Sequence, residues 1–249
     1  MRLATVCARG GSKRLPGKNT RMLHGKPLWL WTVQQAVESG CFDIIVISTD
    51  DPAVGPLRRL ESHIDGDFQI TRVRRPDELA TDTAGKVPAI RHALLRAEEL
   101  TGHTFDRIID LDVTSPLRTL DDIRGFCAKL DTIRDGGLVS VCKSWRSPYF
   151  NQVELCEKDL WGKVDRARLV KWDHGFAYVR SQDAPVTYDL NASMSGWTRN
   201  YLLADDRHPV SFNTYIYEMP RERSWDIDDE LDLEIVEFLM RKQQEAKAA

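Results

Sequence analysis

The chain has 249 residues, of which 42% are hydrophobic and 29% are charged, and its formal net charge is −3. This composition is typical of a globular protein with a sizeable core, and it predicts no general attraction to nucleic acid or to a membrane. The five cysteines are widely spaced and lack a CxxC pattern, which argues against a disulfide framework and a zinc site. The longest apolar stretch, 27–33, is too short to span a bilayer. Because Arg9 interrupts any signal-peptide pattern, we expect a cytoplasmic protein.

Short apolar runs alternate with helical patterns along the first 140 or so residues. Strands are expected at 3–7, 44–49, 68–73, 107–112 and 138–142. Helices are expected at 27–40, 84–101 and 119–134, with a less regular one at 52–63. Strands that alternate with helices pair in parallel and are covered on both faces. The pattern therefore predicts an α/β fold with a doubly wound, mostly parallel sheet.

The regular alternation ends near residue 143. Residues 145–200 contain short strand-like runs broken by Pro, Gly and Asn, which predicts an inserted flap or dimerisation subdomain within one domain over 1–249. The last predicted helix, 228–244, begins with acids and has basic residues near its end, as the helix dipole favours.

A glycine-rich, basic segment, ARGGSKRLPGKN (8–19), directly follows the first expected strand. It is not a Walker loop, because Asn19 follows Lys18, and it is not a dinucleotide fingerprint, because Ser12 stands where a glycine is required. Glycines let backbone N–H groups approach an anion, and basic side chains neutralise its charge. The segment suits a nucleoside triphosphate, although a solvated basic turn would have a similar composition.

Three further polar segments also follow expected strands, namely 48–51, 74–83 and 112–118. Together with 8–19 they fall at the carboxyl ends of parallel strands, which is where open α/β sheets bind ligands. This convergence favours a binding or catalytic function for the glycine-rich segment.

Six segments, in order along the chain, resemble the CMP-sialic acid synthetase (acylneuraminate cytidylyltransferase) family. They are ARGGSKRLPGKN, GKPLWLWTVQQA, FDIIVISTDD, RRPDELATDTA, DVTSPLRTLDDI and SWDIDDELDLEIVEFL. The resemblance implies a nucleotidyltransferase that uses CTP to activate a nonulosonic acid of the sialic or legionaminic type and releases pyrophosphate. It also implies a homodimer and Mg²⁺ as cofactor.

By this resemblance, the glycine-rich segment binds the triphosphate of CTP. The implied nucleotide-binding residues are Arg9, Gly10, Gly11, Ser12, Lys13, Lys18, Asn19 and Arg75. Arg75 would contact the cytosine or ribose, and an exposed surface charge is the alternative for it. The implied catalytic set is Arg9, Lys13, Lys18, Asp226 and Asp228.

Asp226 and Asp228 match the metal-binding D-x-D of the family. Two residues apart in an extended segment, they project to one side, and carboxylates are ligands that Mg²⁺ prefers. The alternative is that Asp228 or Asp229 caps the C-terminal helix.

Asp112 departs from the family pattern, which has glutamine in front of the P-T-S-P-L-R sequence. Two interpretations remain open: Asp112 is a further metal ligand, or it contacts a sugar that carries a different substituent.

The other implied sugar-binding residues are Ser115, Arg118, Arg180, Gln182 and Asn191. Arg180 would hold the sugar carboxylate through its planar guanidinium, and a salt bridge between subunits is the alternative.

Three rival functions are weighed against this one. A Kdo cytidylyltransferase shares the R-L-P-G-K sequence but lacks the TSPLR and N-A-S motifs. A non-catalytic nucleotide-binding module would not need the complete catalytic set, and an NAD-dependent oxidoreductase would need the missing dinucleotide fingerprint.

Overall fold

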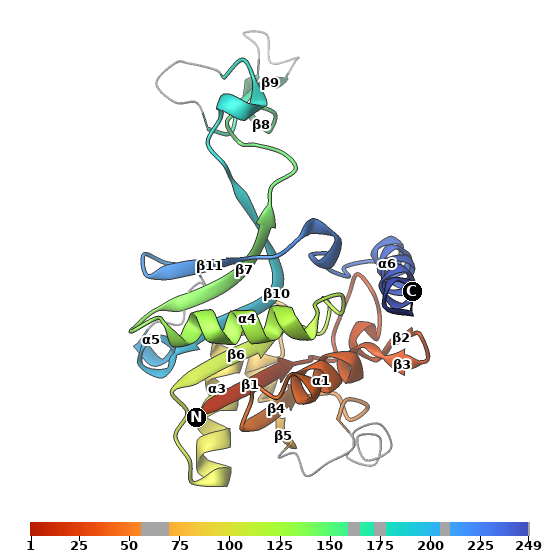
Figure 1. The fold of residues 1–249 in the computed structure, drawn as a ribbon, viewed down its shortest axis with the longest axis vertical. Helices are drawn as coiled ribbons and strands as arrows, with labels where there is room; N and C mark the ends of the chain where they lie inside the picture. The colour runs from red at the N-terminus through yellow and green to blue at the C-terminus, as the bar shows by residue number, and fades with distance from the viewer. Residues whose placement is uncertain (56–69, 159–164, 172–177, 205–209, 249) are drawn as a thin grey trace. The chain divides into compact units, whose positions relative to one another are not determined.

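The computed structural model describes residues 1–55, 70–158, 165–171, 178–204 and 210–248 (Figure 1). The chain divides into two compact units: unit 1 comprises Met1–Val141 and Asn191–Ala249, and unit 2 comprises Cys142–Leu190. None of the helices in the described part of the chain combines the length and apolar character that crossing a bilayer requires.

Unit 1 contains a seven-stranded sheet in the order β11-β7-β10-β6-β1-β4-β5. Strands β1, β4, β5 and β6 pair in parallel, as do β7 and β11, whereas β10 is antiparallel to β6. The bounds are β1 Arg2–Cys7, β4 Ile44–Thr49, β5 Ile70–Arg74, β6 Arg107–Leu111, β7 Gly137–Lys143, β10 Tyr188–Thr198 and β11 Thr214–Glu218.

Helices cover both faces of this sheet (Figure 1). On β4, Ile45 and Ile47 join one buried cluster with residues of α1, α4 and α6, whereas Ile44 and Val46 join a second cluster with α3 and α5. The helices are α1 Leu28–Ser39, α3 Lys86–Thr101, α4 Leu120–Asp131, α5 Arg199–Ala204 and α6 Glu230–Ala248. Burial on both faces explains why all of β4 is buried, and the predicted doubly wound α/β class is confirmed.

Short elements complete the described residues. They are β2 Met22–Leu23, β3 Lys26–Pro27, β8 Val153–Lys158, β9 Asp165–Leu169 and the 3₁₀ turns η1 Lys18–Thr20, η2 Asp77–Leu79, η3 Ser181–Asp183 and η4 Arg221–Arg223. In unit 2, β8 and β9 form an antiparallel pair. Most of the helix expected at 52–63, and the first two residues of the strand expected at 68–73, lie outside the described residues.

Strand β10 is the main feature of the sheet that the sequence pattern did not predict. It lies between β6 and β7, so the strand expected at 138–142, which is β7, is separated from β6 and the other parallel strands of the first half of the chain. Ala192 has a φ of 54°, which interrupts the extended run. Gly196 lets α4 approach closely, because a Cβ there would lie 2.8 Å from a ring carbon of Phe126. A glycine inside a strand-like run suggests a loop when only the sequence is known. In the structure, Gly196 instead allows close packing within the sheet.

An ion pair fixes the segment that leads into α6. Arg223 Nε and Nη2 donate to the two carboxylate oxygens of Asp122 at 2.8 and 2.9 Å. Asp122 also accepts hydrogen bonds from the backbone N–H and hydroxyl of Thr119, which caps α4. Burial raises the pKa of Asp122, but the hydrogen bonds from Arg223 and Thr119 outweigh burial, so the net pKa lies below its ordinary value. The chain just before Asp226 is thereby attached to α4.

Asp122→Asn is expected to lower the free energy of unfolding by about 2 kcal/mol at neutral pH, because it leaves the half-buried Arg223 without a counter-charge. A carboxyl with a lowered pKa stabilises the fold above its unfolded pKa, and this stability is lost as pH falls through the folded value. The difference between variant and wild type in urea denaturation should therefore shrink in acid. Asp121→Asn is the matched control, because Asp121 is 91% exposed on the same turn. Equal losses in the two variants would contradict this assignment.

Candidate active site

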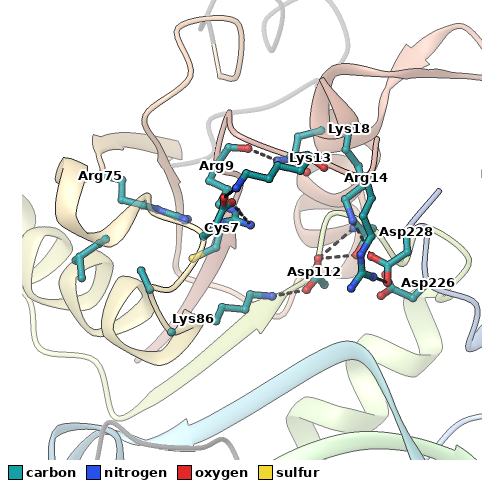
Figure 2. A pocket seen from close by; sticks show the side chains of 17 residues that line it. Cys7, Arg9, Lys13, Arg14, Lys18, Arg75, Lys86, Asp112, Asp226 and Asp228 are labelled. Atoms are coloured by element: carbon teal, nitrogen blue, oxygen red, sulfur yellow. Dashed lines mark hydrogen bonds and ion pairs between the residues drawn. The ribbon is translucent and has the colours of Figure 1, made fainter. Parts of the chain in front are cut away.

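A cavity of about 540 Å³ lies in unit 1 at the carboxyl ends of the parallel strands (Figure 2). The segments after β1, β5 and β6 line it, together with the first residues of α3 and the segment before α6. All five residues of the predicted catalytic set line this cavity, and so do the predicted site residues Ser12, Asn19, Arg75 and Asp112. The structure thus brings together motifs that are up to about 220 residues apart in the sequence.

The glycine-rich segment is held in place by its own neighbours. The Gly10 N–H donates to Asp50 Oδ1 at 3.0 Å, and Asn19 Nδ2 donates to the Arg9 carbonyl at 2.8 Å. A Cβ on Gly10 would lie 3.3 Å from Asp51 Cβ, so this position favours glycine by close approach, whereas Gly11 faces open space. Asp50, at the end of β4, therefore positions the loop, and the sequence pattern did not identify this role.

Asp82 pairs with two cations of the glycine-rich segment. Its carboxylate lies 3.2 Å from Arg9 Nη2 and 2.5 Å from Lys13 Nζ, and Arg9 Nη1 also donates to the Thr81 carbonyl at 2.6 Å. The hydrogen bond from Lys13 is the main cause that holds the pKa of Asp82 below its usual value. The loop after β5 is therefore attached electrostatically to the loop after β1.

Asp228 pairs with the other two cations of the segment. Its oxygens lie 2.6 Å from Arg14 Nη1 and 3.1 Å from Lys18 Nζ, and Lys18 also donates to the Ile227 carbonyl at 2.8 Å. Of the two residues considered as caps of the C-terminal helix, Asp229 takes that role, because its carboxylate accepts the Asp232 N–H at 3.0 Å. The Asp228 carboxylate is directed at the glycine-rich loop.

Arg75 is not a surface charge, because only 5% of it is exposed. Its guanidinium donates to the hydroxyl and carbonyl of Ser48 at 3.2 and 3.0 Å. Both contacts come from β4, so the strand fixes the direction in which Arg75 enters the cavity. In Figure 2, Arg75 lies on the side of the cavity away from Asp226 and Asp228, whereas Arg14 and Lys18 of the glycine-rich segment lie beside Asp228.

The carboxylate of Asp226, in the wall of the cavity, lacks a hydrogen-bond partner among the described residues at one of its oxygens. Within the described part of the chain, its Oδ1 atom is buried and has no hydrogen-bond partner. Burial, followed by the nearby charge of Asp112, raises its pKa above the ordinary value. No group of three or more Asp, Glu, His or Cys side chains that could hold a metal occurs among the described residues. A buried carboxylate oxygen without a partner nevertheless fits a divalent cation, since hard oxygen ligands completed by water suit Mg²⁺.

Lys86, the first residue of α3, was not identified from the sequence. Its ammonium forms ion pairs with Asp112 and with Asp110, at 2.7 Å in the second case, and Figure 2 shows it reaching towards Asp112. Burial raises the pKa of Asp112, but the charge of Lys86 outweighs this effect and lowers the pKa to about 2. A cation at a helix N-terminus opposes the helix dipole, and this unusual placement is the sequence signal that could have drawn attention to Lys86.

Three of the predicted sugar-binding residues do not line the cavity. Arg118 is 2% exposed and donates to the Asp112 carbonyl at 2.5 Å and the Ser193 carbonyl at 2.7 Å. Ser115 and Asn191 are also buried, and Asn191 Oδ1 accepts the Ser140 hydroxyl at 2.6 Å. Their hydrogen bonds tie the chain after β6 to β10, and the predicted contact with a sugar stays a prediction.

Arg180 and Gln182 belong to unit 2. Arg180 Nε and Nη2 donate to the Asp183 carboxylate at 2.8 and 3.0 Å, which is a local contact across one turn. The predicted role of both residues in sugar binding is likewise still a prediction.

Comparisons with known proteins agree with this geometry. Residues 3–131 match the family model described as cytidylyltransferase. The chain is 35% identical to the post-translational flagellin modification protein B of Campylobacter coli, covering 96% of this chain and 95% of that protein. It is also 35% identical to a CMP-N,N'-diacetyllegionaminic acid synthase of Campylobacter jejuni, covering 96% and 94%.

A solved structure of a CMP:2-keto-3-deoxy-manno-octonic acid synthetase complexed with CTP shares the fold. Its TM-score is 0.64 at 16% sequence identity, covering 97% of this chain and 99% of that one. The resemblance drawn from the six sequence segments is confirmed. With residues 3–131 matched and close relatives along nearly the whole chain, the protein is a nucleotidyltransferase that belongs to the cytidylyltransferase family.

Proposed function

We propose that the protein transfers CMP from CTP to the anomeric hydroxyl of a nonulosonic acid of the sialic or legionaminic type and releases pyrophosphate. The observation that carries the proposal is the cavity itself, in which the cations of a glycine-rich loop face the carboxylates of Asp226 and Asp228. Relatives named as CMP-N,N'-diacetyllegionaminic acid synthases support this sugar class.

The nucleotide lies along the glycine-rich segment in this proposal. Arg9, Lys13 and Lys18 neutralise the triphosphate, and the buried Arg75 contacts the cytosine or ribose. Each cation already has a carboxylate or carbonyl partner in the protein. Phosphate oxygens are stronger partners because they carry more charge, so binding exchanges one set of ion pairs for another.

The transfer step is a displacement at the α-phosphate. A bond forms between the anomeric oxygen of the sugar and the α-phosphorus while the O–H bond of that hydroxyl breaks and its proton passes to solvent. The bond from the α-phosphorus to the bridging oxygen breaks, and its pair of electrons leaves with pyrophosphate. Catalysis of such a step depends on holding the two reactants in line and on neutralising the charge of the phosphates. The glycine-rich loop, held by Asp50 after β4, and the segment before α6, attached to α4 through Arg223, provide the necessary rigidity.

Mg²⁺ is part of the proposal, with Asp226 and Asp228 as the residues that would hold it. When bound, the ion would neutralise charge on the transferred phosphate. The support is the buried Oδ1 of Asp226, which has no hydrogen-bond partner among the described residues. Asp228 currently binds Lys18 and Arg14, so those cations must turn to the triphosphate when the ion is bound.

We also propose a cytoplasmic homodimer in which unit 2 supplies part of the subunit contact. Val153, Leu155 and Val179 in this unit are 63%, 73% and 89% exposed. Apolar side chains gathered at such exposure in one small unit commonly mark a protein interface.

The experiment that tests the function is pyrophosphate release from CTP and Mg²⁺ with N-acetylneuraminate, N,N'-diacetyllegionaminate, pseudaminate and Kdo. Release is expected with one of the nine-carbon acids. Release with Kdo alone would instead favour the Kdo cytidylyltransferase, and CTP binding without release from any sugar would favour a non-catalytic module. Asp226→Asn should reduce release at least about a hundredfold, because metal support contributes several kcal/mol. Asp229→Asn, on the same segment, serves as the control and should be nearly as active as wild type.

Asp82→Asn is expected to tighten CTP binding by about two- to fivefold, because the triphosphate no longer competes with an exposed carboxylate for Arg9 and Lys13. Product inhibition by pyrophosphate should strengthen in the same proportion. The control is Asp77→Asn, since Asp77 lies on the same loop and pairs with Arg74 at 3.7 Å on the surface. Weaker CTP binding in Asp82→Asn would mean that Asp82 orients the loop and does not compete with the nucleotide.

A further inference from the structure

Three charged groups meet where β6 ends, at the wall of the cavity. The carboxylates of Asp110 and Asp112 are 2% and 19% exposed, and the Lys86 ammonium forms an ion pair with each. Neighbouring carboxylates with so little solvent repel one another strongly unless a cation lies between them. At this position the cation comes from the protein itself.

All four oxygens of the two carboxylates already have donors. Asp110 accepts the Thr5 hydroxyl at 2.7 Å through Oδ1 and the Lys86 ammonium at 2.7 Å through Oδ2. Asp112 accepts the Thr114 N–H and hydroxyl, at 3.1 and 2.9 Å, through Oδ1 and the Lys86 ammonium through Oδ2. Asp226 differs from both, because its buried Oδ1 has no partner within the described part of the chain.

The position of Lys86 also argues against a surface charge that pairs by chance. It is the first residue of α3, where the helix dipole disfavours a positive charge. Its ammonium reaches two carboxylates that are 2% and 19% exposed, and the side chain lines the same cavity as Asp226 and Asp228. The chain therefore places a cation against the local dipole, in reach of two carboxylates at the floor of the site.

We propose that the Lys86 ammonium occupies the position at which Asp110 and Asp112 would otherwise bind a divalent cation, so that Asp112 positions Lys86 and is not itself a metal ligand. The third N–H of the ammonium has no acceptor among the described residues and would serve an oxygen of the reactants. This inference deepens the proposed function, in which a metal is held at Asp226 and Asp228, by excluding a second metal at the end of β6.

The test counts bound Mn²⁺, used in place of Mg²⁺, by electron paramagnetic resonance on the full-length protein without nucleotide or sugar. Lys86→Met is expected to bind one more Mn²⁺ per chain than wild type, because the two carboxylates then lack a counter-charge. Lys86→Arg should bind the same number as wild type. Lys86→Met combined with Asp112→Asn should lose the additional ion. Mn²⁺ should also raise the melting temperature of Lys86→Met more than that of wild type.

Asp112→Asn alone decides the question if Lys86→Met does not fold. It keeps Lys86 paired with Asp110, and the proposal predicts that Mn²⁺ affinity stays within about twofold of wild type, whereas loss of a metal ligand would cost at least about tenfold. A tenfold loss in Asp112→Asn, or a folded Lys86→Met with no additional ion, would overturn the proposal. These counts require no turnover, so a failure of the sugar assay would leave them unaffected.

Discussion

Charge balance at the carboxyl edge of the parallel strands is the constraint on which the rest of the site depends. Four cations of the glycine-rich segment are paired with Asp82 and Asp228, and Lys86 is paired with the two carboxylates at the end of β6. Unpaired charges at partly buried positions would be costly. The same pairs hold loops from distant parts of the sequence against one another, so neutralising the charges also builds the walls of the cavity.

A consequence of this arrangement is that substrate binding is an exchange of partners. A nucleotide triphosphate brings the negative charge that Asp82 and Asp228 supply in the free protein, and a metal at Asp226 and Asp228 would replace the charge that Lys18 gives to Asp228. Lys86 stays outside this exchange, because its two partners are Asp110 in β6 and Asp112 directly after it, and neither of these pairs with the glycine-rich segment among the described residues. The protein thus combines exchangeable ion pairs at the glycine-rich loop with a permanent one near the proposed point of transfer.

The sequence was sufficient to predict the layered fold, because an uninterrupted apolar run such as 44–49 indicates a strand whose two faces are both covered by helices. It was not sufficient to place β10, since Gly196 and Asn191 resemble loop residues until the close packing of α4 is known. The strand-end motifs predicted which loops form the cavity, but not the ion pairs within it. Nothing in the spacing of residues 86 and 112 indicates that they meet. Similarly, Arg118 has the chemistry of a ligand-binding residue, yet it is buried and its guanidinium is hydrogen-bonded within the protein.

The most direct test of this account is calorimetric titration of the protein with CMP, CDP and CTP in the absence of divalent cations. If the glycine-rich loop exchanges its carboxylate partners for phosphates, each additional phosphate gains charge-assisted hydrogen bonds, and affinity should rise by at least about tenfold per phosphate. The dependence should weaken at high salt, because the exchanged groups are partly exposed. Equal affinities for the three nucleotides would contradict the assignment of the loop as the triphosphate site.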